Sequence, residues 1–390
     1  MKKREVVLKP GKEKAVRQRH HWIFSGAIQQ LPQFQAGECL PVASASGEPL
    51  GWGYFNPGSS LAGRMVSFGT IPFQEAILEH LNQALCLRKA LLDPVETTVY
   101  RLVNGEGDLL PGLVVDCYGP VVVVQMATAG VVALRSLIVD WIVATLKPIC
   151  IYEKSTGPAR REEGLEDAEG VLYGSLPEEL VVKENGLLFT VPVVSGQKTG
   201  LFLDHRAMRQ RVRELARGKR VLNCFGYTGG FSVYAAAGGA SCVDTVDISA
   251  EAIAGARRNM ELNGFSTDPE QYITEDVFTF LRRSSLEYDL VILDPPAFAK
   301  RKKDVIPGCR GYKDINRIAL QKMPPGSLLL TSSCSYYVDP ILFQKVVFQA
   351  ALEAKRVVKI IGRHELAVDH PINLCHPEGE YLKSLLLFVE

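Results

Sequence analysis

Two residues in the second half of the sequence have side chains that could carry out covalent chemistry together. Asp294 and Cys334 each stand at the end of an apolar run, within Leu290–Phe298 and Leu328–Ser335. A cysteine thiolate is a strong nucleophile, and a transient bond from it to a substrate carbon splits one difficult step into easier ones. The alternative is that Cys334 is a small residue of the core, the more common role of a free cysteine. The serines that flank it favour a polar loop, and therefore catalysis.

Both residues are predicted to follow buried strands. The run Leu290–Phe298 ends in Asp294-Pro295-Pro296, and two successive prolines cannot continue a β-ladder. The chain must therefore leave the sheet here. Because open α/β sheets bind ligands at the carboxyl ends of their strands, this edge is where we expect the chemistry.

A third strand end, in Lys219–Asp247, has the pattern of a nucleoside-binding unit. A short apolar strand is followed by a turn with Gly226, Gly229 and Gly230, a helix of small residues, and a second strand that ends at Asp247. Glycines let the backbone approach a ligand, and the acid can accept hydrogen bonds from ribose hydroxyls. The spacing G-x-x-G-G differs from the G-x-G-x-x-G of pyrophosphate binders. Ordinary strand–turn–helix packing is the alternative, but three polar strand ends within about one domain length favour a site.

Length and composition bound the class of protein. A chain of 390 residues should hold two or three domains, and a net charge of +1 excludes a general polycation. The nine cysteines contain no C-x-x-C pair, so we predict no metal site and reduced thiols, as in the cytoplasm. The first residues lack the apolar segment of a secretory signal, and charges interrupt the apolar stretch 120–146. We therefore predict a cytoplasmic protein with no membrane contact.

Three domains are predicted along the chain. Short β-like runs with glycine turns make residues 1–70 a small barrel. A periodic helix followed by β-like pieces makes residues 71–185 a small α+β domain. Its polar turn near Arg101 and its charged segment 160–163 are expected to be solvated. Residues 186–390 form the α/β domain that contains the three strand ends.

Two basic segments suit contact with nucleic acid, since cations pair with phosphates and aromatic rings stack on bases. One lies in the first twenty residues, and the other follows the Asp-Pro-Pro segment. A solvated surface is the alternative for both. The predicted RNA-binding residues are Lys9, Arg17, Arg19, Phe298, Lys300, Arg301, Lys302 and Lys303.

The C-terminal half resembles class I S-adenosylmethionine-dependent methyltransferases. The whole chain resembles, more narrowly, the ribosomal RNA large-subunit cytosine-C5 methyltransferase family. The resemblance implies a PUA domain, a small α+β domain and a Rossmann-like α/β domain. It is carried by GDLLPGLVVDCYG (Gly107–Gly119), QKTGLFLDHR (Gln197–Arg206), NCFGYTGGF (Asn223–Phe231), VDIS (Val246–Ser249), EDVF (Glu275–Phe278), DPPAFAK (Asp294–Lys300), SCS (Ser333–Ser335) and EYLKSLLL (Glu380–Leu387).

The resemblance implies S-adenosylmethionine as the methyl donor, and it assigns residues to hold it. Asp204 or Arg206 would meet the methionine end, although Asp204 could instead cap the following helix. Glu275 competes with Asp276 for the adenine amino group. The full predicted set is Thr199, Phe202, Asp204, Arg206, Asn223, Phe225, Gly226, Tyr227, Thr228, Gly229, Asp247, Ile248, Asp276, Asp294 and Pro295.

The implied substrate is a cytosine of 23S ribosomal RNA, methylated at C5. That carbon is too weak a nucleophile on its own, but attack of the Cys334 thiolate on C6 turns the ring into an enamine. Asp294 would bind the N3/N4 edge of the base, and Phe298 would stack on a flipped-out base. Lys300 or Arg301 would favour the thiolate.

One position departs from the family's pattern. Many RNA cytosine-C5 methyltransferases have a second cysteine where this chain has Pro296, so the group that acts in product release is unassigned. Cys309, in a predicted loop, is the nearest thiol in sequence to that motif.

Two other functions fit the same residues. Asp-Pro-Pro-aromatic loops also serve methylation of exocyclic amines such as guanine N2, which needs no cysteine. A non-catalytic RNA-binding or ribosome-assembly protein could also retain the fold. The sequence leaves open the target nucleotide and whether the chain forms a homodimer.

Overall fold

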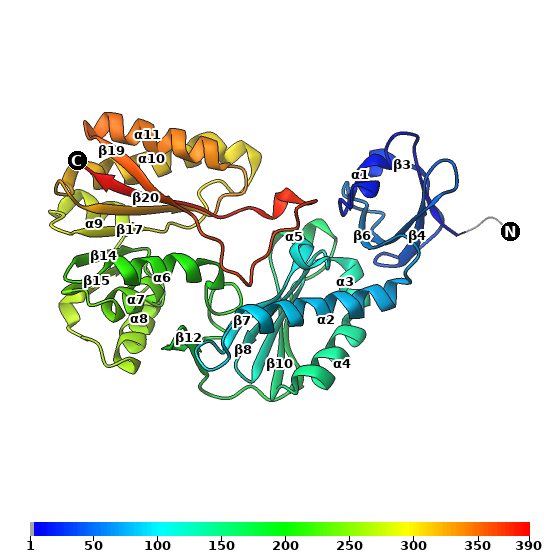
Figure 1. Cartoon of the computed structure of the whole chain (residues 1–390), viewed down its shortest axis with the longest axis horizontal. Coiled ribbons are helices and arrows are strands. Elements are labelled where there is room, and N and C mark those ends of the chain that lie inside the picture. Colours follow the sequence, from blue (N-terminus) through cyan, green and yellow to red (C-terminus); the bar gives the residue numbers. More distant parts are fainter. Residues whose placement is uncertain (1–3) are drawn as a thin grey trace. The chain divides into compact units, whose positions relative to one another are not determined.

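The computed structural model describes residues 4–390 and divides the chain into two compact units (Figure 1). Among the described residues, unit 1 comprises 4–186, Val191–Leu203 and Val368–Gly379. Unit 2 comprises Leu187–Thr190, Asp204–Ala367 and Glu380–Glu390. Each unit therefore includes segments that are distant in the sequence.

Unit 1 begins with a six-stranded sheet in the order β2-β6-β5-β4-β1-β3. Short strands and glycine turns are what the sequence predicts for this region. At Gly51, φ is +138° and a Cβ would lie 2.1 Å from the Ser67 carbonyl oxygen, so only glycine fits between the paired strands. The elements are β1 (Val6–Leu8), α1 (Lys14–Arg17), β2 (Trp22–Ile23), η1 (Ser25–Ala27), β3 (Ile28–Gln30), β4 (Cys39–Ala43), β5 (Pro49–Phe55) and β6 (Gly63–Phe68).

A second, five-stranded sheet in unit 1 has the order β11-β10-β9-β8-β7. Helix α2 (Phe73–Leu91) buries Ile77, Leu81 and Leu85 in the core of this region, as its periodicity predicts. Two further helices, α3 and α4, meet at Leu134. The other elements are β7 (Val99–Asn104), η2 (Gly105–Asp108), β8 (Leu113–Tyr118), β9 (Val121–Met126), α3 (Ala129–Ala133), α4 (Arg135–Leu146), β10 (Cys150–Ser155), α5 (Pro158–Glu162), β11 (Ala168–Gly174) and β12 (Val181–Glu184).

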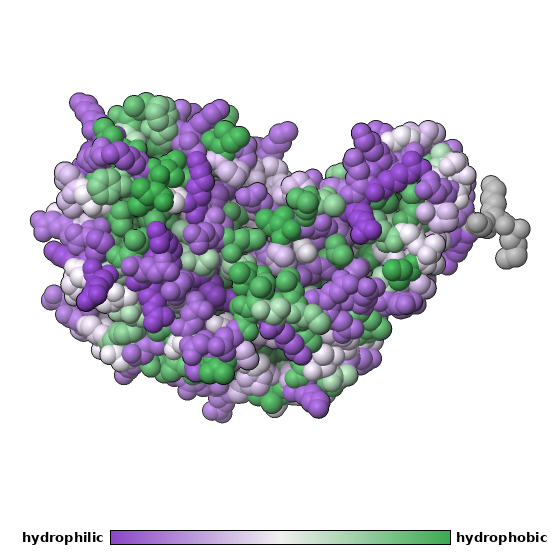
Figure 2. All heavy atoms as spheres, viewed as in Figure 1, coloured by the Kyte–Doolittle hydropathy of each residue, from purple (hydrophilic) through white to green (hydrophobic). Residues whose placement is uncertain are grey.

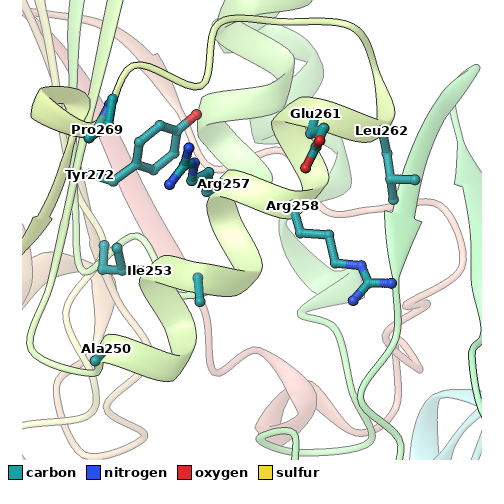
Figure 3. Close-up of a pocket in the computed structure, with 9 residues that line it drawn as sticks. Ala250, Ile253, Arg257, Arg258, Glu261, Leu262, Pro269 and Tyr272 are labelled. Carbon is teal, nitrogen blue, oxygen red and sulfur yellow. The ribbon is translucent and has the colours of Figure 1, made fainter.

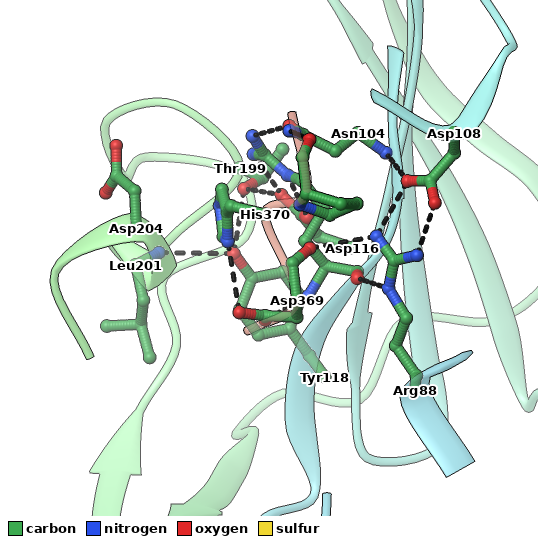
Figure 4. Close-up of polar contacts among 12 residues, drawn as sticks. Arg88, Asn104, Asp108, Asp116, Tyr118, Thr199, Leu201, Asp204, Asp369 and His370 are labelled. Carbon is green, nitrogen blue, oxygen red and sulfur yellow. Dashed lines mark hydrogen bonds and ion pairs between the residues drawn. The ribbon is translucent and has the colours of Figure 1, made fainter. Parts of the chain in front are cut away.

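Two polar segments of unit 1 that the sequence suggested were solvated contain buried residues, although Arg161 and Glu162 are exposed as expected. Arg160 and Glu163 are 5% and 7% exposed, and Glu163 accepts an ion pair from Arg64 at 2.7 Å. Asp108, in the turn after β7, is bound by both terminal nitrogens of Arg88 at 2.5 and 2.7 Å (Figure 4). The expectation was wrong for Arg160, Glu163 and Asp108, because charged side chains can enter a core when they find polar or oppositely charged partners.

Unit 2 contains a seven-stranded sheet in the order β16-β15-β14-β17-β18-β20-β19. The first five strands are parallel, whereas β20 is antiparallel to both neighbours. This is the predicted Rossmann-like arrangement. The strands are β14 (Arg220–Cys224), β15 (Cys242–Asp247), β16 (Tyr272–Thr274), β17 (Leu290–Leu293), β18 (Leu328–Ser333), β19 (Val358–Arg363) and β20 (Lys383–Val389), and β13 (Leu187–Thr190) lies outside this sheet.

Helices cover both faces of this sheet (Figure 1). Residues of α6 and α7 share one core with inward residues of β14 and β17, and residues of α10 and α11 share the other. Strands buried on both faces explain why the sequence shows continuous apolar runs rather than alternation. The helical elements are η3 (Leu203–His205), α6 (Arg206–Leu215), α7 (Gly230–Ala237), α8 (Ala250–Leu262), η4 (Pro269–Gln271), α9 (Val277–Arg283), η5 (Lys302–Asp304), α10 (Val305–Lys322) and α11 (Pro340–Ala354), with η6 (Pro377–Gly379) in unit 1.

Apolar side chains are exposed along α11 and on the edge strand β19. Ile341, Phe348 and Leu352 of α11 and Ile361 of β19 are 47–70% exposed. Figure 2 shows hydrophobic surface over this part of unit 2. Whether the chain forms a homodimer stays open. Among the helices of residues 4–390, none is both long and apolar enough to cross a membrane.

Candidate active site

Four strand ends of unit 2 form one edge because their strands are neighbours in the sheet. The order β15-β14-β17-β18 brings together Asp247, the turn after Cys224, Asp294 and Cys334. The parallel register pairs Cys224 with Leu293, and Leu293 with Thr331. Residues that are far apart in sequence therefore meet at the carboxyl edge, as the strand pattern predicts.

The Cys334 thiol lies against the Asp-Pro-Pro segment. Its Sγ donates to the backbone carbonyl of Pro295 at 3.9 Å. Cys334 is only partly buried, and the side chain of Asp294 is 21% exposed. A nucleophile and a carboxylate thus lie on adjacent loops, and both can be reached by a ligand.

The glycine-rich turn has a strained backbone. Phe225 and Tyr227 have φ values of 57° and 44°, which non-glycine residues rarely adopt. At Gly229, φ is +77° and a Cβ would lie 2.9 Å from Cβ of Ala256. Such strain gathers at ligand sites when the surrounding structure enforces it, and the missing Cβ allows α8 to pack closely against the turn.

Asp247 is held by the turn that it faces. One carboxylate oxygen accepts from the backbone N–H of Tyr227 and the other from that of Ser249, each at 2.9 Å. Each oxygen retains a second lone pair for a ribose hydroxyl. Asn223 is instead directed inward, since its amide donates to Ser232 Oγ at 2.9 Å.

The structure separates two candidates for the adenine amino group. Glu275 forms an ion pair with Arg283, with one nitrogen–oxygen distance of 2.8 Å, and this contact lowers the pKa of its carboxyl. Asp276 caps α9 by accepting from the Thr279 backbone through one oxygen, Oδ1, at 2.9 Å. The geometry favours Asp276.

His205 is a neighbour of Asp294 that the sequence prediction missed. Its Nε2 lies 3.1 Å from Asp294 Oδ1, and its side chain is 4% exposed. The signal was present, because His205 stands between the predicted residues Asp204 and Arg206.

The proposed cap by Asp204 is not seen: the N-cap of α6 is His205, without a capping side chain. Asp204 accepts a hydrogen bond from the Tyr381 hydroxyl.

Lys383 is a second missed residue. It is paired with Ser333 across β18 and β20, and it is 6% exposed. Its Nζ donates to the backbone carbonyls of Ser335 at 2.5 Å and Tyr381 at 2.9 Å. Burial lowers the pKa of Lys383 to about 8, while the nearby Cys334 opposes this shift.

The basic segment after the Asp-Pro-Pro motif is partly helical rather than a long loop. Arg301 forms an ion pair with Asp304 at 3.1 Å and is 69% exposed, and α10 begins at Val305. Cys309 therefore lies on a helix, where burial raises the pKa of its thiol. The Phe298 ring packs against Tyr312, with ring centroids 4.6 Å apart.

The predicted cofactor residues Thr199 and Phe202 belong to unit 1. Thr199 is fully buried, and its hydroxyl donates to Asp116 at 2.6 Å and contacts the Tyr118 hydroxyl at 2.8 Å (Figure 4). Lys198 lies 4.3 Å from the ring centre of Phe202. The Thr199 hydroxyl therefore makes these hydrogen bonds within unit 1.

The turn at Asp369 and two of the N-terminal cations, Arg17 and Lys9, have partners in unit 1. Asp369 is 1% exposed and accepts from the Arg101 backbone at 2.8 Å, so this turn is anchored. Arg17 forms an ion pair with Glu48, and Lys9 donates to the Gly26 carbonyl at 2.9 Å.

One group of side chains in unit 1 has the composition of a metal site. Ligand atoms of His20, His376 and Glu378 lie within 4.8 Å of one another. However, Nδ1 of His20 accepts from the Trp22 backbone at 3.2 Å, which puts the proton of a neutral ring on Nε2, facing Glu378 at 3.3 Å. A metal would need that lone pair, so the hydrogen bonds account for the group without an ion.

A surface pocket along α8 lies apart from the predicted site residues (Figure 3). It is lined by Ala250, Ile253, Ala254, Arg257, Arg258, Glu261, Leu262, Pro269 and Tyr272, none of which is a predicted site residue. The candidate site is therefore located by the carboxyl edge of the sheet and not by this pocket.

Comparison with known proteins agrees with the fold. A sequence profile described as S-adenosylmethionine-dependent methyltransferase matches residues 165–373, and a PUA-like domain profile matches residues 6–68. The chain belongs to the S-adenosylmethionine-dependent methyltransferase family. The predicted fold class is confirmed, and S-adenosylmethionine is confirmed as the cofactor.

Individual relatives match over nearly the whole chain. Proteins named ribosomal RNA large subunit methyltransferase I from Aliivibrio fischeri and Alteromonas mediterranea are each 42% identical, covering 97% and 98% of this chain and 98% of each relative. A SAM-dependent methyltransferase structure from Streptococcus mutans is 26% identical with a TM-score of 0.83, covering 98% of this chain and 99% of that one. A methyltransferase structure complexed with SAH is also 26% identical, with a TM-score of 0.84 and the same coverage.

Proposed function

We propose that this protein methylates C5 of a cytosine in large-subunit ribosomal RNA through a covalent adduct with Cys334. The observation that carries the proposal is the position of the Cys334 thiol, 3.9 Å from the Pro295 carbonyl and on the same edge as Asp294 and Asp247. The names of the relatives supply the class of RNA. A thiol beside this motif has a direct role in C5 chemistry and none in amine methylation.

The cofactor would be held by the turn and by the acids around it. Asp247 would be oriented toward ribose hydroxyls by two backbone N–H groups, and Asp276 caps α9 through Oδ1, so its Oδ2 would meet the adenine amino group. The strained turn Phe225–Gly229 brings backbone close to the ligand. When bound, S-adenosylmethionine supplies an electrophilic methyl group.

The remaining chemistry belongs to the chain's own side chains. Cys334 would bond to C6 of cytosine and so make C5 nucleophilic. Asp294 would hold the N3/N4 edge, and His205 would fix the orientation of Asp294 through the 3.1 Å contact. The ammonium form of Lys383 would favour the thiolate, a role that the sequence assigned to Lys300 or Arg301.

Contacts to RNA outside the reacting base would come from the PUA-like domain and the basic segment near the edge. Lys300, Lys302 and Lys303 lie beside the Asp-Pro-Pro motif, and PUA-like residues 6–68 include Lys9, Arg17 and Arg19. A ribosomal RNA substrate would place the protein in the cytoplasm.

A variant at the thiol tests this function. Purified wild-type protein and Cys334→Ala are each incubated with methyl-labelled S-adenosylmethionine and unmodified 23S ribosomal RNA, and the labelled nucleoside is identified. We expect 5-methylcytidine from the wild type and none from Cys334→Ala, with donor binding retained. Cys309→Ala is the matched control and should keep its activity. Equal incorporation by Cys334→Ala, or label on an exocyclic amine, would contradict the proposal.

Binding of the donor without label in any RNA would instead favour a non-catalytic role in RNA binding.

A further inference from the structure

The proposed C5 transfer leaves one step without a residue. After the methyl group is added, C5 carries both the methyl group and a proton, and the adduct remains bonded to the enzyme through C6. Aromaticity returns only when a base removes that proton. Pro296 stands where many RNA C5 methyltransferases have a second thiol. Cys309, the nearest thiol in sequence to that motif, lies on α10, where burial raises its pKa.

Lys383 is placed beside the nucleophile by the sheet. Strand β20 runs antiparallel to β18, and the register sets Lys383 opposite Ser333, the residue before Cys334. Its Nζ reaches past the strand end to the carbonyl of Ser335, the residue after Cys334, at 2.5 Å. The amine nitrogen is therefore bound to the segment that carries the thiol.

An uncharged Lys383 can make both of its hydrogen bonds and still keep a lone pair. A neutral amine has two N–H donors and one lone pair, whereas an ammonium group has three donors. Two backbone carbonyls, those of Ser335 and Tyr381, accept from Nζ. With both hydrogens of a neutral amine used in this way, the third position of the nitrogen holds a lone pair that can accept a proton.

Burial makes the uncharged form accessible near neutral pH. The side chain is 6% exposed, and desolvation lowers its pKa to about 8. Cys334, Asp339 and Glu380 act in the opposite direction, because a negative charge on any of them favours the ammonium form. A base works best when its pKa lies near the working pH.

We infer that Lys383 is the base that takes the C5 proton and so releases the methylated RNA. Once sulfur is bonded to C6 it no longer carries the negative charge that favours the ammonium, so Lys383 gives its proton to solvent and becomes a neutral amine. The Nζ lone pair then bonds to the C5 proton, and the C5–H electrons form the C5=C6 double bond. The C6–S bond breaks, and its electrons leave on sulfur as the Cys334 thiolate beside the newly charged ammonium. No oxidant, reductant or further reactant is needed. The inference rests on the proposed cytosine-C5 function.

Two substitutions at this position separate adduct formation from release. Lys383→Met removes the charge and the lone pair, while Lys383→Arg keeps a cation beside the thiol but cannot act as a base. We expect both to lower multiple-turnover methylation by about 100-fold or more, the usual scale for general-base catalysis. Lys383→Arg should also accumulate a protein–RNA adduct that survives SDS, carrying one methyl group per enzyme.

Lys322→Met is the matched control, because Lys322 also binds backbone carbonyls, those of Leu281 and Ser284, but in another part of unit 2. It should turn over like the wild type and form no lasting adduct. Thermal melting and donor binding check folding. If Lys383→Met does not fold, the test rests on Lys383→Arg and on the pH profile of the wild type. The rate at which the wild type releases methylated RNA should rise with pH to a plateau above about 8.

The outcomes distinguish a failure of the role of Lys383 from a failure of the cytosine-C5 function. Rapid turnover by folded Lys383→Arg without a methylated adduct would overturn the role of Lys383 and leave the C5 function intact. Undiminished methylation by Cys334→Ala would overturn the C5 function and the role of Lys383 with it.

Discussion

Asp108 in unit 1 and Asp294 in unit 2 both follow a strand, but their surroundings differ. The Asp108 carboxylate is 5% exposed, is bound by two nitrogens of Arg88 and also accepts from the Asn104 backbone at 2.6 Å. The Asp294 side chain is 21% exposed and has a single-atom contact with His205. A buried carboxylate that accepts three hydrogen bonds, two of them from one guanidinium, stabilises a fold, whereas one with more unused capacity can still bind a substrate.

The same contrast holds for the cations. Arg88 in unit 1 is held by Asp108, by two backbone carbonyls of its own region and by the carbonyl of Asp369. Lys383 in unit 2 donates to two backbone carbonyls, and its lowered pKa lets it change charge near neutral pH. A buried cation that is paired with a carboxylate therefore indicates a structural role, whereas a buried lysine beside a thiol indicates a catalytic role.

The largest expected effect is on activity at the strand edge. Asp294→Ala should lower methylation by roughly 100-fold to 10,000-fold, because the cytosine ring loses the carboxylate that orients it. The midpoint of thermal unfolding should change little. The steady-state rate with 23S ribosomal RNA measures the effect, and the surface acid Asp268→Ala serves as control. A rate close to that of the wild type would mean that Asp294 plays no part in turnover.

The next effect is on stability and belongs to unit 1. Asp108→Ala leaves Arg88 buried without its carboxylate, which should cost roughly 3–5 kcal/mol in the free energy of unfolding. Urea denaturation measures this loss. Asp167→Ala breaks the exposed pair with Arg161 and should leave the midpoint unchanged. If both substitutions had the same effect, burial would not distinguish the two pairs.

Acid should weaken unit 1 through His21. Burial lowers the pKa of this imidazole to about 4, whereas an unfolded histidine titrates near 6.5. Between these values only the unfolded chain takes up the proton, so stability is present above pH 6.5 and is lost as the pH falls toward 4. The loss should approach about 3 kcal/mol.

His21→Gln should flatten that profile, as measured by urea midpoints from pH 7 to pH 4. His80→Gln is a milder control, because its pKa is also lowered by burial but the side chain is only partly buried. An unchanged slope in His21→Gln would assign the acid sensitivity to other groups.

The smallest effect concerns the glycine turn. Gly229→Ala places a Cβ 2.9 Å from Ala256 at a φ of +77°, which should cost about 1–2 kcal/mol from the left-handed backbone alone and weaken donor binding. Gly218→Ala has a similar φ of +71° with nothing within 4 Å, so it should share the backbone cost and keep donor affinity. Calorimetry with S-adenosylmethionine separates the two, and equal affinities would remove the turn from the cofactor site.

The order of strands, turns and helices in unit 2 was predictable from the sequence. Apolar runs such as Leu290–Leu293 and glycine turns are local signals, and the neighbouring parallel strands then bring Asp247, Asp294 and Cys334 to one edge. Lys383 and His205 were missed because their partners come from register and packing. Lys383 meets the thiol segment only through the antiparallel pairing of β20 with β18, about 50 residues apart.

The errors in unit 1 have a related cause. Arg160 and Glu163 lie in a charged segment, which composition assigns to solvent. Glu163 is buried because Arg64, almost one hundred residues earlier, supplies its counter-charge. No local pattern in the sequence shows such pairing.

The most direct test of the central claim uses cells that lack the gene and are complemented with either the wild type or Cys334→Ala. Large-subunit ribosomal RNA from each strain is digested, and its modified nucleosides are mapped by mass. The account predicts one 5-methylcytidine that is lost with the gene, restored by the wild type and not restored by Cys334→Ala. An unchanged 5-methylcytidine map in the cells without the gene, or full restoration by Cys334→Ala, would contradict it.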